Sequence, residues 1–424
     1  MKFGNFLFPD SRDPERDGVV IDETLREAWL SDELGVDAIW LAEHHFDGIC
    51  AYADPIGFAG ALATSTRRSK IGFAVLQMAL HHPIRLAEQL AVLDNITQGR
   101  LIVGLGRGSS YNIYDYQGFG IDHHEAQARL DEAEEIMVRA WTEAEFRHHG
   151  RFWDLEVPML RPRPYTRPHP PLIRAASGEA SMLELARQGR PFLMNVQSSL
   201  TTRRRFELYL EAMAEAGFDH ESIARNLDDC WVWRNVFVAD TDAEAERIGI
   251  LAFQAMVEAR AELRNRIYRE TGRRIEVPAS DLPSARASVD HGVICGSPRR
   301  VAEAIAEIDD LGVGGVIATF RLGPMAHEAA AKSLRLFMTE VAPRFRGGST
   351  GEKARAVTGC LLNGSIEFRC RSPGFATLDR PSAPASASAR REPNKHGRPR
   401  IGQASVSTLA DRRSDARARR RNQR

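Results

Sequence analysis

The chain lacks several features that assign a protein quickly to a class. No apolar run approaches the roughly 18 residues that a membrane-spanning helix needs, and the first residues lack the basic head and long apolar middle of a signal peptide. The five cysteines are scattered and include no C-x-x-C pair, so neither a disulfide framework nor a zinc site is indicated. We therefore expect a cytoplasmic protein with structural thiols and no membrane partner.

Common cofactor and metal motifs are missing as well. The glycine-rich stretch Gly104–Gly108 is not a G-x-G-x-x-G, and no second strand ending in an acid follows about 20 residues later, so a Rossmann dinucleotide site is poorly supported. The histidines show neither H-x-H nor H-E-x-x-H spacing, and adjacent residues on a strand point to opposite sides. We therefore expect no bound metal and no nicotinamide site.

Charge is distributed unevenly although the net charge is zero. Residues 347–424 contain 17 Lys and Arg against 6 Asp and Glu, and they are rich in Ser, Pro and Ala. Such a composition cannot bury enough apolar surface to offset chain entropy. The sequence therefore predicts a folded domain over 1–346 and a disordered basic tail over 347–424. The tail lacks interleaved aromatic residues, so nucleic acid is not an expected partner.

Short apolar runs alternate with helical segments over the first 345 residues, as in parallel β-α-β units. The strands are predicted near 2–8, 38–42, 70–77, 101–106, 171–175, 191–195, 230–239 and 315–320. The helices are predicted near 22–34, 55–65, 83–99, 123–141, 179–188, 201–216, 241–269, 298–311 and 325–342. Eight such units favour a (β/α)8 TIM barrel, with a doubly wound sheet as the alternative. Two segments without clear periodicity, 146–169 and 271–292, are interpreted as insertions.

The stretch from Ala38 to Asp47 is an apolar run that ends in Glu43, His44 and His45. In a barrel the loops after the strands meet at one mouth, so one of these histidines should face it. An imidazole that titrates near neutrality can act there as an acid or a base. The alternative is a structural histidine or a surface pair, as the other pairs at 81–82, 123–124 and 148–149 suggest.

Two loops at predicted strand ends have features of a phosphate site. In the first, Gly106 and Gly108 allow the backbone to approach an anion, and Arg107 supplies bidentate hydrogen bonds. In the second, a strand meets a helix N-terminus, whose free amides attract phosphate and whose Ser177 and Ser181 add hydroxyl donors. A tight turn at the first loop and a simple helix cap by Ser177 are the alternatives.

With these motifs assembled, the chain resembles the bacterial luciferase-like flavin-dependent monooxygenase family over about residues 1–345. The motifs recur together in order and spacing, and they are Trp40–Phe46, His82–Arg85 with the following Leu93-Asp94, Gly104–Gly108, Ala176–Ser181 and Gly296–Pro298. The tail after residue 346 has no counterpart in this resemblance.

The resemblance implies a barrel that binds reduced FMN across the mouth. The cofactor-binding residues that it implies are Ala74, Val75, Gly106, Arg107, Ser177, Gly178 and Ser181, with Arg129 as a weaker phosphate candidate. The bond between Ala74 and Val75 would be the family's non-proline cis peptide beneath the isoalloxazine. The catalytic residue would be His44, which matches the histidine that supports the flavin hydroperoxide in luciferase. Glu43 and His45 would orient it or pack behind it.

The implied reaction is that of an FMN-dependent monooxygenase similar to alkanal monooxygenases. Reduced FMN, supplied by a separate flavin reductase, would react with O2 to a C4a-peroxyflavin that oxygenates a small organic substrate. A dimer formed through helices near the second and third units is also implied. The aromatic walls expected from Phe8, Phe46, Tyr111, Tyr114 and the 271–292 insertion suit an apolar or aromatic compound.

Two other functions stay open at this point. One is a hydride-transfer oxidoreductase that uses the deazaflavin F420, because relatives of that kind share the superfamily. The other is a noncatalytic flavin-binding partner subunit, against which the presence of both His44 and Arg107 argues. The identity of the substrate lies beyond the sequence.

Overall fold

The computed structural model describes residues 1–108, 113–176, 178–272 and 289–346. The chain divides into two units, Met1–Glu367 and Phe368–Arg424, and all described residues belong to the first. The predicted disordered tail, 347–424, lies outside the described residues. Within the described part of the chain, no helix is both long enough and apolar enough to cross a membrane.

Eight parallel strand positions close into a barrel, and β1 pairs with β12 to complete the ring. This closure confirms the predicted (β/α)8 barrel and excludes the doubly wound sheet, which has two open edges. The barrel strands in ring order are β1 (Lys2–Leu7), β2 (Ala38–Leu41), β3 (Lys70–Phe73) with its continuation β4 (Leu76–Gln77), β5 (Leu101–Gly106), β8 (Leu172–Ala176), β9 (Phe192–Met194), β10 (Trp231–Val238) and β12 (Gly315–Thr319).

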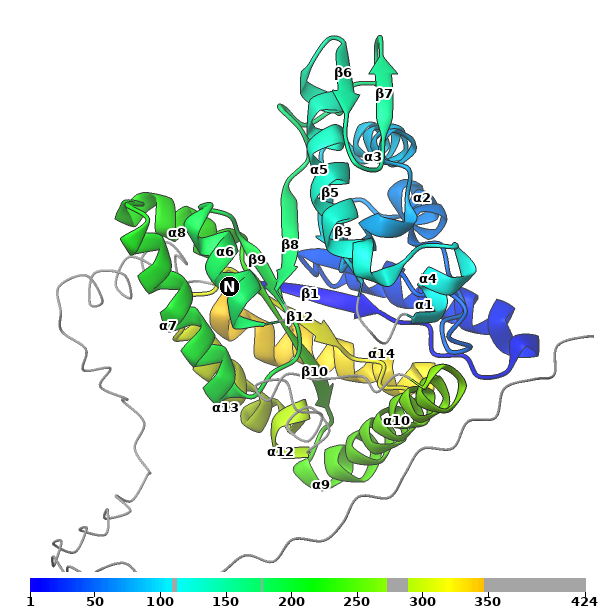
Figure 1. The fold of residues 1–424 in the computed structure, drawn as a ribbon. Coiled ribbons are helices and arrows are strands. Elements are labelled where there is room, and N and C mark those ends of the chain that lie inside the picture. Colours follow the sequence, from blue (N-terminus) through cyan, green and yellow to red (C-terminus); the bar gives the residue numbers. More distant parts are fainter. Residues whose placement is uncertain (109–112, 177, 273–288, 347–424) are drawn as a thin grey trace, which may run out of the picture. The chain divides into compact units, whose positions relative to one another are not determined.

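Helices lie around the outside of the strands (Figure 1). They are α1 (Asp17–Glu33), α2 (Pro55–Ser65), α3 (Pro83–Thr97), α5 (Ala126–Thr142), α6 (Glu179–Arg187), α7 (Ser199–Glu215), α8 (His220–Asp229), α9 (Asp242–Ala245), α10 (Leu251–Thr271), α13 (Pro298–Asp309) and α14 (His327–Leu336). Their limits follow from local chemistry. Asp54 caps α2 by accepting hydrogen bonds from two backbone amides, and Gln98 and Gly99 end α3 in the left-handed conformation, with φ of 54° and 85°.

The sequence pattern does not predict several helices and strands of the structure. The strand β11 (Val293–Gly296) pairs with β10 outside the barrel, and α8 is a separate helix that was not predicted. The segment 146–169, interpreted as an insertion without periodicity, contains the antiparallel hairpin of β6 (Phe146–His149) and β7 (Asp154–Val157), which lies next to α5 (Figure 1). Each of these strands has four residues, too few to show a period of two. Most of the other expected insertion, 273–288, lies outside the described residues.

The barrel interior is filled by large side chains that face glycines. Its cluster of buried residues comprises Phe6, Ala38, Trp40, Ala42, Ile102, Ile173, Leu193, Trp231 and Ile317. The rings of Trp40 and Trp231 meet edge to face, with centroids 5.2 Å apart. A Cβ atom on Gly4 or on Gly72 would come within 2.5 Å of the Trp40 indole. These two strands therefore carry glycine because a tryptophan from the neighbouring strand occupies the space.

The substitution Gly72→Ala tests this packing. Its methyl group would lie 2.5 Å from Trp40 Cε3, so we expect the free energy of unfolding to fall by about 1–3 kcal/mol. Urea unfolding measures the change. The control is Gly60→Ala on α2, where a Cβ atom meets nothing within 4 Å and where alanine should stabilise the helix by up to about 1 kcal/mol. Equal stability of Gly72→Ala and the native chain would show that the Trp40 ring is loosely packed.

Candidate functional site

The alternation of side chains along β2 delivers His44 to the barrel mouth. Trp40 and Ala42 belong to the interior cluster, whereas Ile39 and Leu41 pack in the cluster outside the strands. His44 comes two residues after Ala42, so the alternation places it on the same, interior face. Its ring packs edge to face on Phe8, with centroids 5.2 Å apart, and Phe8 packs against the interior cluster. The predicted catalytic residue therefore lies at the carboxyl end of the barrel.

The ends of the neighbouring strands β3, β4 and β5 carry small residues. Ala74 packs against the interior cluster, and the peptide bond between Ala74 and Val75 is cis, as the resemblance implied. A Cβ atom on Gly104 would overlap the backbone of Phe73, and one on Gly106 would overlap the Val75 side chain. Only glycine fits at these two positions of β5, so the backbones of β3, β4 and β5 approach closely under the mouth.

The two candidate phosphate loops come from adjacent strands. Arg107 follows β5 and is exposed, and Gly178 follows β8, the neighbour of β5 in the barrel. At the start of α6 the Ser181 hydroxyl donates to the Gly178 carbonyl oxygen at 2.9 Å. A Cβ atom on Gly178 would meet nothing within 4 Å, so space is open in front of this helix N-terminus. Ser177, the third residue predicted for this loop, lies outside the described residues.

The weaker candidate, Arg129, contacts Glu125 and Phe152. Its Nη2 atom lies 3.1 Å from the carboxylate of Glu125, and its guanidinium lies 4.3 Å from the centre of the Phe152 ring. Of the residues expected to line the substrate pocket, Phe8 lies at the mouth and Phe46 is 60% exposed. The Tyr114 hydroxyl donates to Glu270 at the end of α10. Tyr111 lies outside the described residues.

A buried carboxylate, Glu43, connects the strand ends behind His44. Its Oε1 atom lies 3.0 Å from His45 Nε2 and 2.8 Å from His81 Nε2. Its Oε2 atom accepts a hydrogen bond from the Gln77 backbone amide at 2.5 Å. The Gln77 side chain in turn donates to Asp115 in α4 (Ile113–Gly118) at 2.6 Å. One carboxylate therefore ties the end of β2 to β4 and, through Gln77, to the segment after β5.

This network sets opposite protonation preferences for two adjacent histidines. Burial alone raises the pKa of Glu43, but the charge of His81 and hydrogen bonds from both imidazoles and from Gln77 outweigh it and lower the pKa from 4.5 to about 2. Burial lowers the pKa of His45, yet its hydrogen bond to Glu43 and that residue's charge raise it overall. For His44, burial prevails over the charges of Asp47 and Asp115, so its pKa is lowered. The two pKa values are therefore shifted in opposite directions, toward the neutral form for His44 and toward the cation for His45.

Sequence reasoning found His44 but not the residues that hold its surroundings. His81 was interpreted as part of a surface pair, and Gln77 and Asp115 were not singled out. They lie 38, 34 and 72 positions from Glu43 in the chain, so no local pattern links them to it. Only the parallel alignment of the strands brings them together, because it places all carboxyl ends at one mouth.

The substitution Glu43→Gln removes the charge and keeps the shape of the side chain. The lowered pKa of Glu43 means that its anion stabilises the fold fully above pH 4.5 and less as the pH falls toward 2. The raised pKa of His45 means that its cation contributes fully below pH 6.5 and less as the pH rises through the folded-state pKa. We expect the variant to lose about 3 kcal/mol of unfolding free energy between about pH 4.5 and pH 6.5. Below and above this window the loss should be smaller.

Urea unfolding of both proteins at about pH 3, 5.5 and 8 measures this profile. The control is Glu88→Gln on α3, because the carboxylate of Glu88 is 43% exposed and lies 3.5 Å from Arg85. That control should differ from the native chain by less than about 0.5 kcal/mol at each pH. A loss in Glu43→Gln that does not change with pH would contradict an ionised pair.

Comparison with known proteins agrees with this architecture. The family model described as luciferase-like monooxygenase matches residues 1–315. The alkanal monooxygenase alpha chain of Photorhabdus luminescens is 26% identical over 231 residues, which is 54% of this chain and 62% of that protein. The oxygenase component of flavin-dependent trigonelline monooxygenase from Acinetobacter baylyi is 29% identical over 177 residues, which is 42% of this chain and 49% of that protein. The chain spans about half the length of the curated relatives it matches.

Solved structures share the fold over most of the chain. The monooxygenase RslO1 from Streptomyces bottropensis is 30% identical, with a TM-score of 0.66 over 81% of this chain and 100% of that one. The oxygenating constituent of 3,6-diketocamphane monooxygenase from Pseudomonas putida, a type II Baeyer-Villiger enzyme in complex with FMN, has 23% identity and a TM-score of 0.64, over 81% of this chain and 98% of that one. On the match over residues 1–315, this chain belongs to the luciferase-like monooxygenase family.

Proposed function

We propose that the chain is an FMN-dependent monooxygenase that uses reduced FMN and O2, by way of a C4a-peroxyflavin, to oxygenate a small organic substrate. The observation that carries the proposal is that His44, whose pKa is lowered, follows β2 at the barrel mouth, and that the neighbouring strand β3 is followed by the non-proline cis peptide of Ala74 and Val75. Membership of the luciferase-like family supports the same chemistry. Bound reduced FMN would supply the electrons and the site at which oxygen reacts.

The residues at the mouth fit a flavin nucleotide. Gly104 and Gly106 let β5 approach Phe73 and Val75 closely, next to the cis peptide on which the isoalloxazine would lie. The exposed Arg107 offers a guanidinium for a phosphate, and the N-terminus of α6 at Gly178 offers backbone amides next to open space. Because β5 and β8 are neighbours, both groups would contact one phosphate, with Ser177 and Ser181 as the predicted hydroxyl donors.

In this proposal His44 handles the proton. Its imidazole is neutral near pH 7 because burial lowers its pKa, so it can accept a proton at the mouth and return it. Phe8 packs against one side of the ring, and Asp47 Oδ2 lies 3.5 Å from Nδ1. The buried Glu43 holds His45 and His81 and thereby joins the segments that follow β2 and β4. Glu43 is therefore a positioning residue.

The proposal is tested by mixing the protein with reduced FMN without oxygen, admitting air, and recording the absorbance spectrum. We expect a long-lived C4a–oxygen adduct before oxidised FMN appears. Immediate oxidation of FMN would contradict the monooxygenase mechanism. A parallel titration with the deazaflavin F420 distinguishes this function from the main alternative, an F420-dependent hydride-transfer enzyme. Tighter binding of F420 than of reduced FMN would favour the alternative. Two solved structures with this fold, at 16% and 18% identity, are named as F420-dependent enzymes.

The substitution His44→Ala tests the proton-handling role. We expect the adduct lifetime to shorten or turnover to fall by about 10²- to 10⁴-fold, the usual contribution of a general acid or base. The pKa of His44 is lowered from 6.5, so its imidazole becomes protonated only below that pH. Turnover of the native chain should therefore decrease only as the pH falls below 6.5. The variant should not show this decrease. The control is His149→Ala, an exposed histidine on the β6–β7 hairpin. Unchanged kinetics in His44→Ala would remove this residue from the mechanism.

The partners proposed are a separate flavin reductase, as the name "oxygenase component" implies for one relative, and a second copy of this chain. Exposed Val92 and Ile96 on α3 support a dimer through that helix. Sedimentation velocity would show twice the mass of the chain. The cytoplasmic location stays a prediction.

A further inference from the structure

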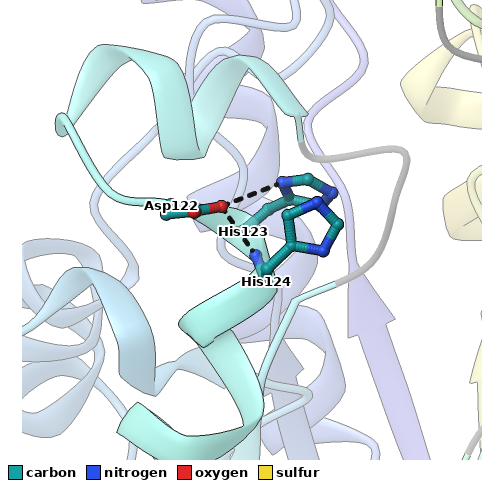
Figure 2. Close-up of side chains that lie close together, drawn as sticks. All are labelled: Asp122, His123 and His124. Atoms are coloured by element: carbon teal, nitrogen blue, oxygen red, sulfur yellow. Dashed lines mark hydrogen bonds and ion pairs between the residues drawn. The ribbon is translucent and has the colours of Figure 1, made fainter.

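Outside the barrel mouth, three consecutive side chains gather potential metal ligands. Asp122, His123 and His124 stand at the start of the turn η4 (His123–Glu125), just before α5. One ligand atom of each residue lies within 4.8 Å of the others. Figure 2 shows the Asp122 carboxylate facing the His123 ring, with the His124 ring beside it. The proposed monooxygenase function does not use this cluster.

The separation of the Asp122 and His123 ligand atoms is compatible with a shared ion. His123 Nδ1 lies 3.4 Å from Asp122 Oδ1, which is long for a charge-assisted hydrogen bond. Two ligands at the usual zinc distances of about 2.1 Å, set at a tetrahedral angle, are about 3.4 Å apart. The two imidazole rings pack with centroids 3.8 Å apart, and one nitrogen of each lies within 4.8 Å of the other.

A cavity next to the cluster leaves room for an ion and its water. Its volume is about 320 Å³, and Asp122 and His123 line it together with Tyr116 from α4 and Glu270 from the end of α10. Among the described residues that line it, the carboxylates of Asp122 and Glu270 carry the negative charge and none is Lys or Arg. The surroundings therefore favour a cation.

We propose that Asp122, His123 and His124 bind a divalent ion of the zinc type, with water completing a tetrahedral site. Two imidazole nitrogens with one carboxylate oxygen suit Zn²⁺ or Co²⁺ better than Mg²⁺ or Ca²⁺, which require mainly oxygen ligands. The bound ion clamps the segment between β5 and α5 at a cavity shared with α10. The sequence predicted no metal because the three ligands are consecutive and match no spaced motif.

The test is a titration of the chelator-treated full chain with ZnCl2 in an isothermal calorimeter. We expect a site with a micromolar dissociation constant, near −8 kcal/mol of binding free energy. The variants His123→Gln and His124→Gln should each bind at least about tenfold more weakly. Asp122→Asn keeps the cap on the His124 amide, since asparagine caps as well as aspartate, and should also weaken binding.

The matched control is His149→Gln. His149 Nδ1 lies 2.6 Å from Asp154 Oδ1 on the exposed hairpin, so it reproduces a histidine next to a carboxylate but is not part of the cluster. This variant should bind Zn²⁺ like the native chain. Thermal melting of each protein without metal checks the fold, and Zn²⁺ should raise the melting temperature of the native chain but not of His123→Gln.

Titration with Co²⁺ identifies the geometry. A tetrahedral site gives an intense visible absorption band, which should appear with the native chain and disappear with His124→Gln. Zinc binding that is equal in the native chain and in the cluster variants would place the ion elsewhere, for example at the cysteines, and overturn the proposal. The proposal would also be overturned if the native chain bound no Zn²⁺ at a metal concentration about 100-fold above the expected dissociation constant.

Discussion

The geometry of the barrel mouth depends on the buried, ionised carboxylate of Glu43. A lone carboxylate with 4% exposure would be costly, but this one is held by two imidazoles and a backbone amide. Its partners are His45, which follows β2, Gln77 in β4 and His81, which follows β4. Any shift of β2 against β4 would leave a buried charge without a partner, so the network keeps His44 and the cis peptide of Ala74 and Val75 in a constant relation.

The same network explains how adjacent histidines acquire different chemistry. His45 lies against Glu43 and is favoured as a cation, whereas His44 packs on Phe8 at the mouth and is favoured as a neutral base. The two histidines of other His-His pairs also differ in their surroundings. His81 joins Glu43 while His82 precedes α3, and His148 is 8% exposed beside Glu132 while His149 lies in solvent beside Asp154. Four identical dipeptides thus serve different purposes.

The pair at 123–124 differs because both rings stay together. A turn, unlike a strand, does not send consecutive side chains to opposite faces, so His123 and His124 remain 3.8 Å apart at their centroids. The rule that adjacent histidines on a strand cannot share a metal therefore does not apply to them. The proposed metal site and the proposed flavin site lie on the same connection between β5 and α5, with Arg107 at its beginning and Asp122 near its end.

The sequence by itself determined the barrel class, the eight strand positions and the place of His44, because alternation along a strand and the order of strands and helices are local properties. It missed β11, α8 and the β6–β7 hairpin, which are too short or too weakly patterned to stand out. Only the tertiary structure decided that Glu43 is paired with His45 and His81, and that Ile96 is exposed. These outcomes depend on contacts between segments tens of residues apart, and a pKa follows from the burial and charges that such contacts create.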